Sequence, residues 1–110
     1  GHIEISELAS LMVIAPCTAN FLGKYANGIA DDALTTSAIA YQGAVLLAPA
    51  MNTRMWQNPA VQRNCATLRA QGVHFVGPGK GRLACGDNGE GRMAEVSEIL
   101  EAIESIRKNA

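Results

Sequence analysis

Cysteine is scarce in this sequence, and its few cysteines are widely separated. The 110-residue chain has three of them, Cys17, Cys65 and Cys85. An odd number without short regular spacing argues against a disulfide framework, and no cysteine or histidine pair has the spacing of a zinc site. We therefore expect no metal centre and a reducing, cytoplasmic environment.

Excess charge of one sign and long apolar runs are also missing. Nine basic and ten acidic residues give a formal net charge of −1. Without a basic stripe, nucleic acid is not expected as the main partner. The longest apolar runs fall far short of the roughly 20 residues that span a membrane, so no membrane segment is expected. What the sequence does have is 48% apolar residues, enough for one domain with a packed core.

Short apolar runs alternate with helical patterns along the chain. The predicted strands are 11–14, 44–47 and 73–76. The predicted helices are 18–26, 59–71 and 95–108, together with a helix that is capped by Asp31 or Asp32 and broken by Gly43. This alternation predicts an α/β fold, with a doubly wound, Rossmann-like parallel sheet and helices on both faces. Because three strands are few for such a sheet, we expect the N-terminal βαβ portion to be missing and residues 1–110 to be the C-terminal part of a single domain.

Helical spacing predicts which side chains face the core. They are Leu34, Ala38 and Ile39, then Val61, Cys65 and Leu68, and finally Val96, Ile99, Leu100, Ile103 and Ile106. Thr53 is predicted to cap a short turn whose Met55 and Trp56 pack into the core. Residues 77–91, which are rich in glycine, are predicted to form one long loop, either functional or disordered.

Three unusual segments follow the predicted strands. They are residues 16–20, residues 49–52 and the glycine-rich loop. The carboxyl ends of parallel strands share one edge of a sheet, and ligands of such folds bind there. The sequence therefore predicts a ligand site made by these three segments together.

Each of these segments is open to more than one interpretation, beginning with the first two. Thr18, Ala19 and Asn20 open a helix, so they either bind an anion at the helix N-terminus or form an ordinary cap. The chain has no GxGxxG or Walker motif, so a standard dinucleotide or triphosphate site is not expected. Asn52 either contacts a ligand through its amide or bonds its own backbone in a turn.

Cys85 lies in the least ordinary segment, residues 81–93. Glycines surround it, and Arg82 and Arg92 stand near it in the sequence. Partial exposure and nearby cations favour a reactive thiolate, and the arginines could hold a phosphate or carboxylate. The alternative is a disordered surface loop.

Taken together, these motifs resemble one protein family along nearly the whole chain. They are His2-Ile3-Glu4, Ala15-Pro16-x-Thr18-Ala19-Asn20, Pro49-x-Met51-Asn52-x-x-Met55-Trp56 and Ala84-Cys85-Gly86-Asp87-x-Gly89-x-Gly91-Arg92-Met93-x-Glu95. The pattern resembles the homo-oligomeric flavin-containing cysteine decarboxylases, and the cysteine-bearing loop is similar to that of their phosphopantothenoylcysteine decarboxylase branch.

The resemblance implies a function and a set of roles. It implies FMN-dependent decarboxylation of 4′-phosphopantothenoylcysteine to 4′-phosphopantetheine in coenzyme A synthesis, by a homo-oligomer that is a trimer or a dodecamer of trimers. His2 is implied as the base and Cys85 as the proton donor. Substrate contacts are implied for Asn52, Arg82, Ala84 and Met93, and FMN contacts for Thr18, Ala19, Asn20, Phe21 and Ala50.

The same resemblance leaves other members of the superfamily as alternatives. These are peptidyl-cysteine decarboxylases, flavin prenyltransferases and non-catalytic relatives that regulate a protein phosphatase. The Cys85 loop argues against the first two, and the lack of a long acidic tail argues against the third. The family's first strand and its Gly/Ser-rich loop near the FMN phosphate have no counterpart in this chain, so we expect the chain alone to bind FMN poorly.

Overall fold

A computed structural model describes residues 11–82 and 88–109. Its central sheet has three parallel strands in the order β1-β2-β3, with a separate antiparallel pair, β4-β5. The strands are β1 (Leu11–Cys17), β2 (Ala44–Pro49), β3 (His74–Phe75), β4 (Gly79–Arg82) and β5 (Asn88–Arg92). The helices are α1 (Ala19–Ala26), α2 (Ala33–Ala40), α3 (Thr53–Gln57), α4 (Pro59–Ala70) and α5 (Val96–Lys108).

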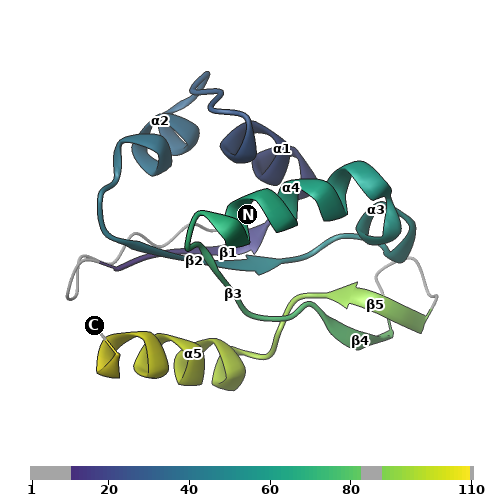
Figure 1. Cartoon of the computed structure of the whole chain (residues 1–110). Helices are drawn as coiled ribbons and strands as arrows, with labels where there is room; N and C mark the ends of the chain where they lie inside the picture. The colour runs from purple at the N-terminus through teal and green to yellow at the C-terminus, as the bar shows by residue number, and fades with distance from the viewer. Residues whose placement is uncertain (1–10, 83–87, 110) are drawn as a thin grey trace.

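Helices lie on both faces of the sheet. Figure 1 shows α1, α2, α3 and α4 on one side of β1 and β2, and α5 on the other. Because side chains alternate along a strand, Met12 and Ile14 of β1 join the core under the first group of helices, whereas Leu11 and Val13 face α5. The predicted doubly wound α/β fold is confirmed.

Local sequence explains where several helices begin. The Asp32 side chain accepts a hydrogen bond from the Thr35 amide at 2.7 Å, and the Asp32 amide donates to the Thr35 hydroxyl at 3.1 Å. This reciprocal cap starts α2, and the hydrogen bonds from Thr35 hold the pKa of Asp32 below its usual value. Pro59 begins α4, as predicted, because its missing N–H costs nothing in the first turn.

The structure corrects several sequence expectations. The glycine-rich segment is not a continuous loop, because Gly79–Arg82 and Asn88–Arg92 pair as antiparallel strands. Asn52, rather than Thr53, caps α3. Side chains predicted to be inside are partly exposed, namely Ile39, Met55, Val96 and Leu100. In α5 the stripe that packs on the sheet contains Ile99, Ile103 and Ile106, so Val96 and Leu100 lie beside it rather than within it.

None of the helices in the described part of the chain has the length and apolar character needed to cross a membrane.

Candidate functional site

The first part of the site is the junction between β1 and α1. The Thr18 hydroxyl accepts a hydrogen bond from the Phe21 amide at 3.1 Å, and the first backbone bond of the helix runs from Leu22 to the Thr18 carbonyl. The amides of Ala19 and Asn20 precede that bond, and the first turn has no acidic side chain. Thr18 and Asn20 are also exposed. This junction therefore offers hydrogen-bond donors and a positive helix end to an electron-rich group.

The side chain of Phe21 is buried, whereas Thr18 and Asn20 are exposed. Its side chain is 4% exposed, and its ring lies 5.3 Å from the ring of Tyr25, measured between centroids. The ring packs in the core between α1 and the sheet. The side chain of Phe21 therefore fixes the helix, and its predicted contact with a cofactor stays a prediction.

The second part of the site is the segment after β2. The Ala50 amide donates to the Cys17 carbonyl at 3.0 Å and so ties this segment to the end of β1. The next polar side chain, Asn52, is exposed, and its Oδ1 accepts a hydrogen bond from the Met55 amide at 2.9 Å. The cap engages Oδ1, so Nδ2 is the part of the amide that can donate to an acceptor on a ligand.

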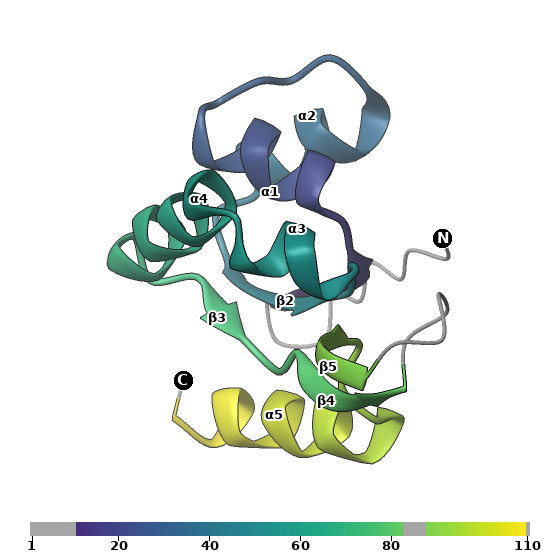
Figure 2. The same cartoon turned by 90° about the vertical axis from the view of Figure 1, so that its right-hand side faces the viewer.

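The third part of the site is β5, which lies against the segment after β2. The Met51 amide donates to the Gly91 carbonyl at 2.9 Å, and the Trp56 indole Nε1 donates to Glu90 Oε1 at 2.9 Å. In Figure 2, where this end of the sheet faces the viewer, α3 lies above β2, and β4 and β5 lie below it. The contact is close because Gly89 and Gly91 have no side chains there. A Cβ on Gly89 would lie 2.6 Å from the Thr53 hydroxyl oxygen.

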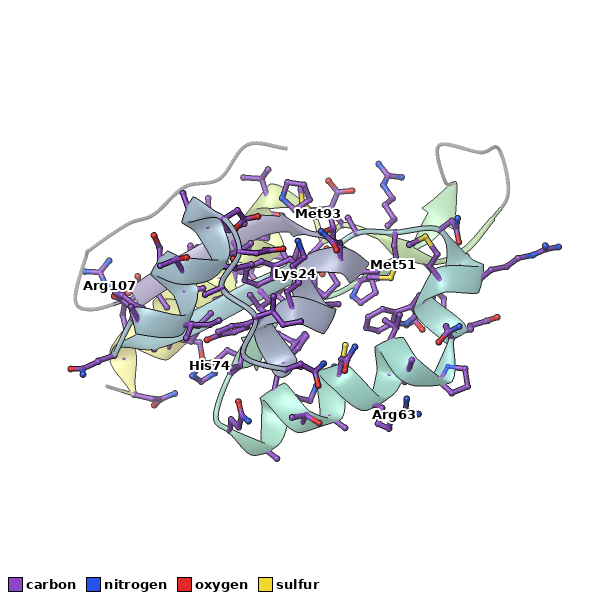
Figure 3. The ribbon with its side chains drawn as sticks, turned by 90° about the horizontal axis from the view of Figure 1, so that it is seen from above. Lys24, Met51, Arg63, His74, Met93 and Arg107 are labelled. Carbon is purple, nitrogen blue, oxygen red and sulfur yellow. The ribbon has the colours of Figure 1, made fainter. Side chains whose placement is uncertain are left out.

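These contacts confirm that the three segments meet at one edge. Consecutive amides hold the arrangement together, since Ala50 donates toward β1 and Met51 donates toward β5. Met93, which follows β5, is half-buried and packs on the α5 side of the sheet. In Figure 3, Met51 lies at the α3 end of the molecule, and His74 and Arg107 lie toward the other end.

Some predicted site residues are placed only in part. Arg82 is the last residue of β4, and its backbone pairs with that of Asn88. His2, Ala84 and Cys85 lie outside the described residues. Residues 83–87 connect β4 to β5, so Cys85 lies between the two paired strands in the sequence.

The two cysteines in the described part of the chain are poor candidates for reactive thiols. Cys17 and Cys65 are both 0% exposed and belong to the same core cluster. Burial raises the pKa of each thiol above its ordinary value, which disfavours the thiolate. Among the three cysteines, Cys85 is therefore the one for which a chemical role is still open.

Sequence reasoning missed the residues that join β5 to α3. Glu90 fell at an unassigned position between two motif glycines, and nothing linked it to Trp56, which lies 34 residues earlier. Gly91 has a backbone φ of +142° and a Cβ there would collide with the Met51 carbonyl oxygen. The alternating glycines at 89 and 91 were the available signal, because strand glycines often mark a close backbone approach.

An α/β sheet with donor-bearing turns gathered at the strand ends is the general architecture of proteins that bind nucleotide-like cofactors. Residues 1–108 match the family described as Flavoprotein. The chain belongs to this family.

Individual relatives agree with that assignment. Over 104 residues the chain is 48% identical to the coenzyme A biosynthesis bifunctional protein CoaBC of Bacillus subtilis, and the match covers 94% of this chain and 26% of the relative. A PPC decarboxylase mutant, solved in complex with pantothenoylaminoethenethiol, superposes with a TM-score of 0.87 at 42% identity. That match covers 90% of this chain and 56% of the solved chain.

A second solved relative is described as the FMN-binding protein AtHal3. Its TM-score is 0.81 at 42% identity, and the match covers 92% of this chain and 56% of the other. The chain thus spans about a quarter of the bifunctional relative and about half of the solved ones.

Proposed function

We propose that the full-length protein uses FMN to decarboxylate 4′-phosphopantothenoylcysteine to 4′-phosphopantetheine, in the biosynthesis of coenzyme A. The observation that carries this proposal is the junction after β2, where the Ala50 amide bonds the end of β1 and the Met51 amide bonds Gly91 of β5, with the exposed Asn52 next in the chain. The similarity to CoaBC and to PPC decarboxylase supports the choice of substrate.

Asn52 is proposed to bind the carboxylate end of the substrate. Its oxygen is held by the Met55 amide, and its Nδ2 group has two N–H donors for a ligand. Carboxylate oxygens accept such bonds, and bonds to a charged acceptor are stronger than neutral ones. The cap thus fixes the orientation of the amide. In that orientation, Nδ2 is proposed to bind a carboxylate more strongly than a neutral group.

The residues at the start of α1 are proposed to contact FMN. Thr18, Ala19 and Asn20 offer donors at a helix end that has no acidic side chain in its first turn, which suits the acceptor atoms of a flavin nucleotide. Ala50 lies beside them through its bond to Cys17. When bound, FMN supplies an electron acceptor for the substrate thiol, which gives the carbon chain an electron sink for loss of CO₂.

The absorption spectrum of the purified full-length protein tests the cofactor. We expect a yellow protein with a flavin spectrum and one FMN released per subunit on denaturation. A colourless protein that takes up no added FMN would contradict the proposal.

His2 is proposed as the base, and Cys85 as the acid that protonates the product carbon. Arg82, Ala84 and Met93 are proposed to hold the substrate. A low-pKa thiol is a suitable general acid near neutral pH, and the burial of Cys17 and Cys65 leaves Cys85 as the available one. A solved cysteine-to-serine mutant of a PPC decarboxylase holds an ethenethiol compound, which supports a cysteine acting after CO₂ has left.

Replacing Cys85 with serine is predicted to change the product rather than abolish CO₂ release. A serine hydroxyl is a much weaker acid than the thiol, so the enethiol accumulates in place of 4′-phosphopantetheine, and the two electrons taken from the substrate thiol stay on the flavin, which remains reduced. Product analysis by mass spectrometry, with CO₂ measured in parallel, checks this outcome. Cys65→Ser is the control and should leave the product unchanged. Normal yields of 4′-phosphopantetheine from Cys85→Ser would remove Cys85 from this role.

The assembly and location are further parts of the proposal. We propose a homo-oligomer built from trimers, as the family resemblance implies, in the cytoplasm. Sedimentation of the FMN-loaded full-length protein tests the assembly, and a monomer would contradict it.

A further inference from the structure

The hydrogen bond between Trp56 and Glu90 has no role in the function proposed so far. Trp56 is 7% exposed, and the N–H of a buried indole needs an acceptor. Glu90, half-buried in β5, supplies that acceptor at 2.9 Å. A bond from an indole to a carboxylate is charge-assisted, and it joins two segments that are distant in sequence.

Asn52 lies between the two points at which β5 holds this segment. On one side, the Met51 amide donates to the Gly91 carbonyl. On the other, Trp56 is bound through its indole to Glu90 and through its backbone amide to the Asn52 carbonyl, at 3.0 Å. A shift of Trp56 is therefore passed through a single helical turn to Asn52.

The shortness of α3 makes these attachments important. The helix has five residues, and a helix of that length is unstable without tertiary contacts. Its N-terminal cap is Asn52 itself, so the amide that is proposed to meet the substrate keeps its direction only while α3 keeps its place. Within the described residues, Glu90 provides the side-chain bond from β5 to this helix.

We propose that Glu90 is a positioning residue for substrate binding, acting through Trp56 and α3 on the amide of Asn52. This inference rests on the proposed function, because it assigns Glu90 to the same substrate site. Glu90 does not touch the substrate carboxylate. It fixes the distance between β5 and Asn52, and the substrate's carboxylate is the group whose binding depends on that distance.

Steady-state kinetics of FMN-loaded full-length protein on 4′-phosphopantothenoylcysteine tests this role. Glu90→Ala is expected to raise KM about tenfold with kcat within about twofold, because it weakens binding without touching the reacting atoms. Glu90→Gln keeps an acceptor oxygen for the indole and is expected to restore KM to within about twofold of wild type. Glu101→Ala, a change of an exposed carboxylate on α5, is the control and should leave KM unchanged.

Trp56→Phe removes the indole N–H that donates to Glu90 and keeps an aromatic ring at this position. It is expected to raise KM as Glu90→Ala does, and the double variant should be no worse than either single one, because both remove the same bond. Hydrogen exchange of residues 51–56 should be faster in Glu90→Ala and normal in Glu90→Gln.

Three outcomes would overturn the inference. One is an active Glu90→Ala variant with wild-type KM, and another is a Glu90→Gln variant as impaired as Glu90→Ala. Both leave the proposed function in place. A wild-type protein that does not act on this substrate overturns the proposed function, and with it the role of Glu90.

Discussion

Replacing Asn52 with aspartate is expected to lower kcat/KM for 4′-phosphopantothenoylcysteine about 1000-fold in the full-length, FMN-loaded protein. The variant keeps an oxygen for the Met55 amide, so the cap of α3 survives. It replaces the Nδ2 donor with a second anionic oxygen, which in the proposed function lies against the substrate carboxylate. Like charges brought together in a site cost several kcal/mol, and about 4 kcal/mol corresponds to the stated loss.

Two controls separate the charge from the fold in this experiment. Asn52→Ser also caps a helix but carries no charge, so it should fall between wild type and Asn52→Asp. A substrate analogue with a carboxamide in place of the carboxylate should bind Asn52→Asp better than the substrate does. Wild-type kcat/KM for Asn52→Asp would show that Asn52 does not face the carboxylate.

Replacing Gly91 with alanine is expected to destabilise the protein by about 3 kcal/mol and to lower kcat/KM roughly 100-fold. The new Cβ would collide with the Met51 carbonyl oxygen, and the backbone φ of +142° is unfavourable for alanine. The collision separates β5 from Met51, which breaks the bond between them and displaces Asn52. Thermal unfolding and steady-state kinetics measure the two effects.

Other glycines in the chain provide matched controls. Gly72 has a φ of +90° and open space around it, so Gly72→Ala carries the backbone strain without the collision or the proximity to the site. A Cβ on Gly79, in β4, would lie 3.9 Å from the Arg92 carbonyl oxygen, which is an ordinary contact, so Gly79→Ala should be almost neutral. A Gly91→Ala variant that is no worse than Gly72→Ala in both measurements would contradict the predicted role of Gly91.

Much of the fold could be predicted because it follows from local patterns. Apolar runs such as Ala44–Pro49 are buried on both faces and can be recognised as strands of a parallel sheet. Pro59 and the Asp32–Thr35 pair mark helix starts by chemistry that acts within a few residues. The meeting of the three segments at one edge follows from the rule that parallel strands end on the same side.

The details that the sequence did not reveal depend on contacts between distant residues. Whether Gly79–Arg82 and Asn88–Arg92 pair as strands depends on β5 docking against Met51 and Trp56, which periodicity cannot report. Thr53 was predicted to cap α3, and the cap is Asn52, because both residue types are good caps and their order in the sequence does not choose between them. Glu90 required the structure, since its partner lies 34 residues away.

The most direct test of the central claim is turnover by the purified full-length protein with FMN bound. With 4′-phosphopantothenoylcysteine as substrate, we predict release of CO₂ and formation of 4′-phosphopantetheine in equal molar amounts. A peptide ending in cysteine, offered under the same conditions, should give little or no CO₂. The claim is contradicted if CO₂ is released from the peptide and not from 4′-phosphopantothenoylcysteine.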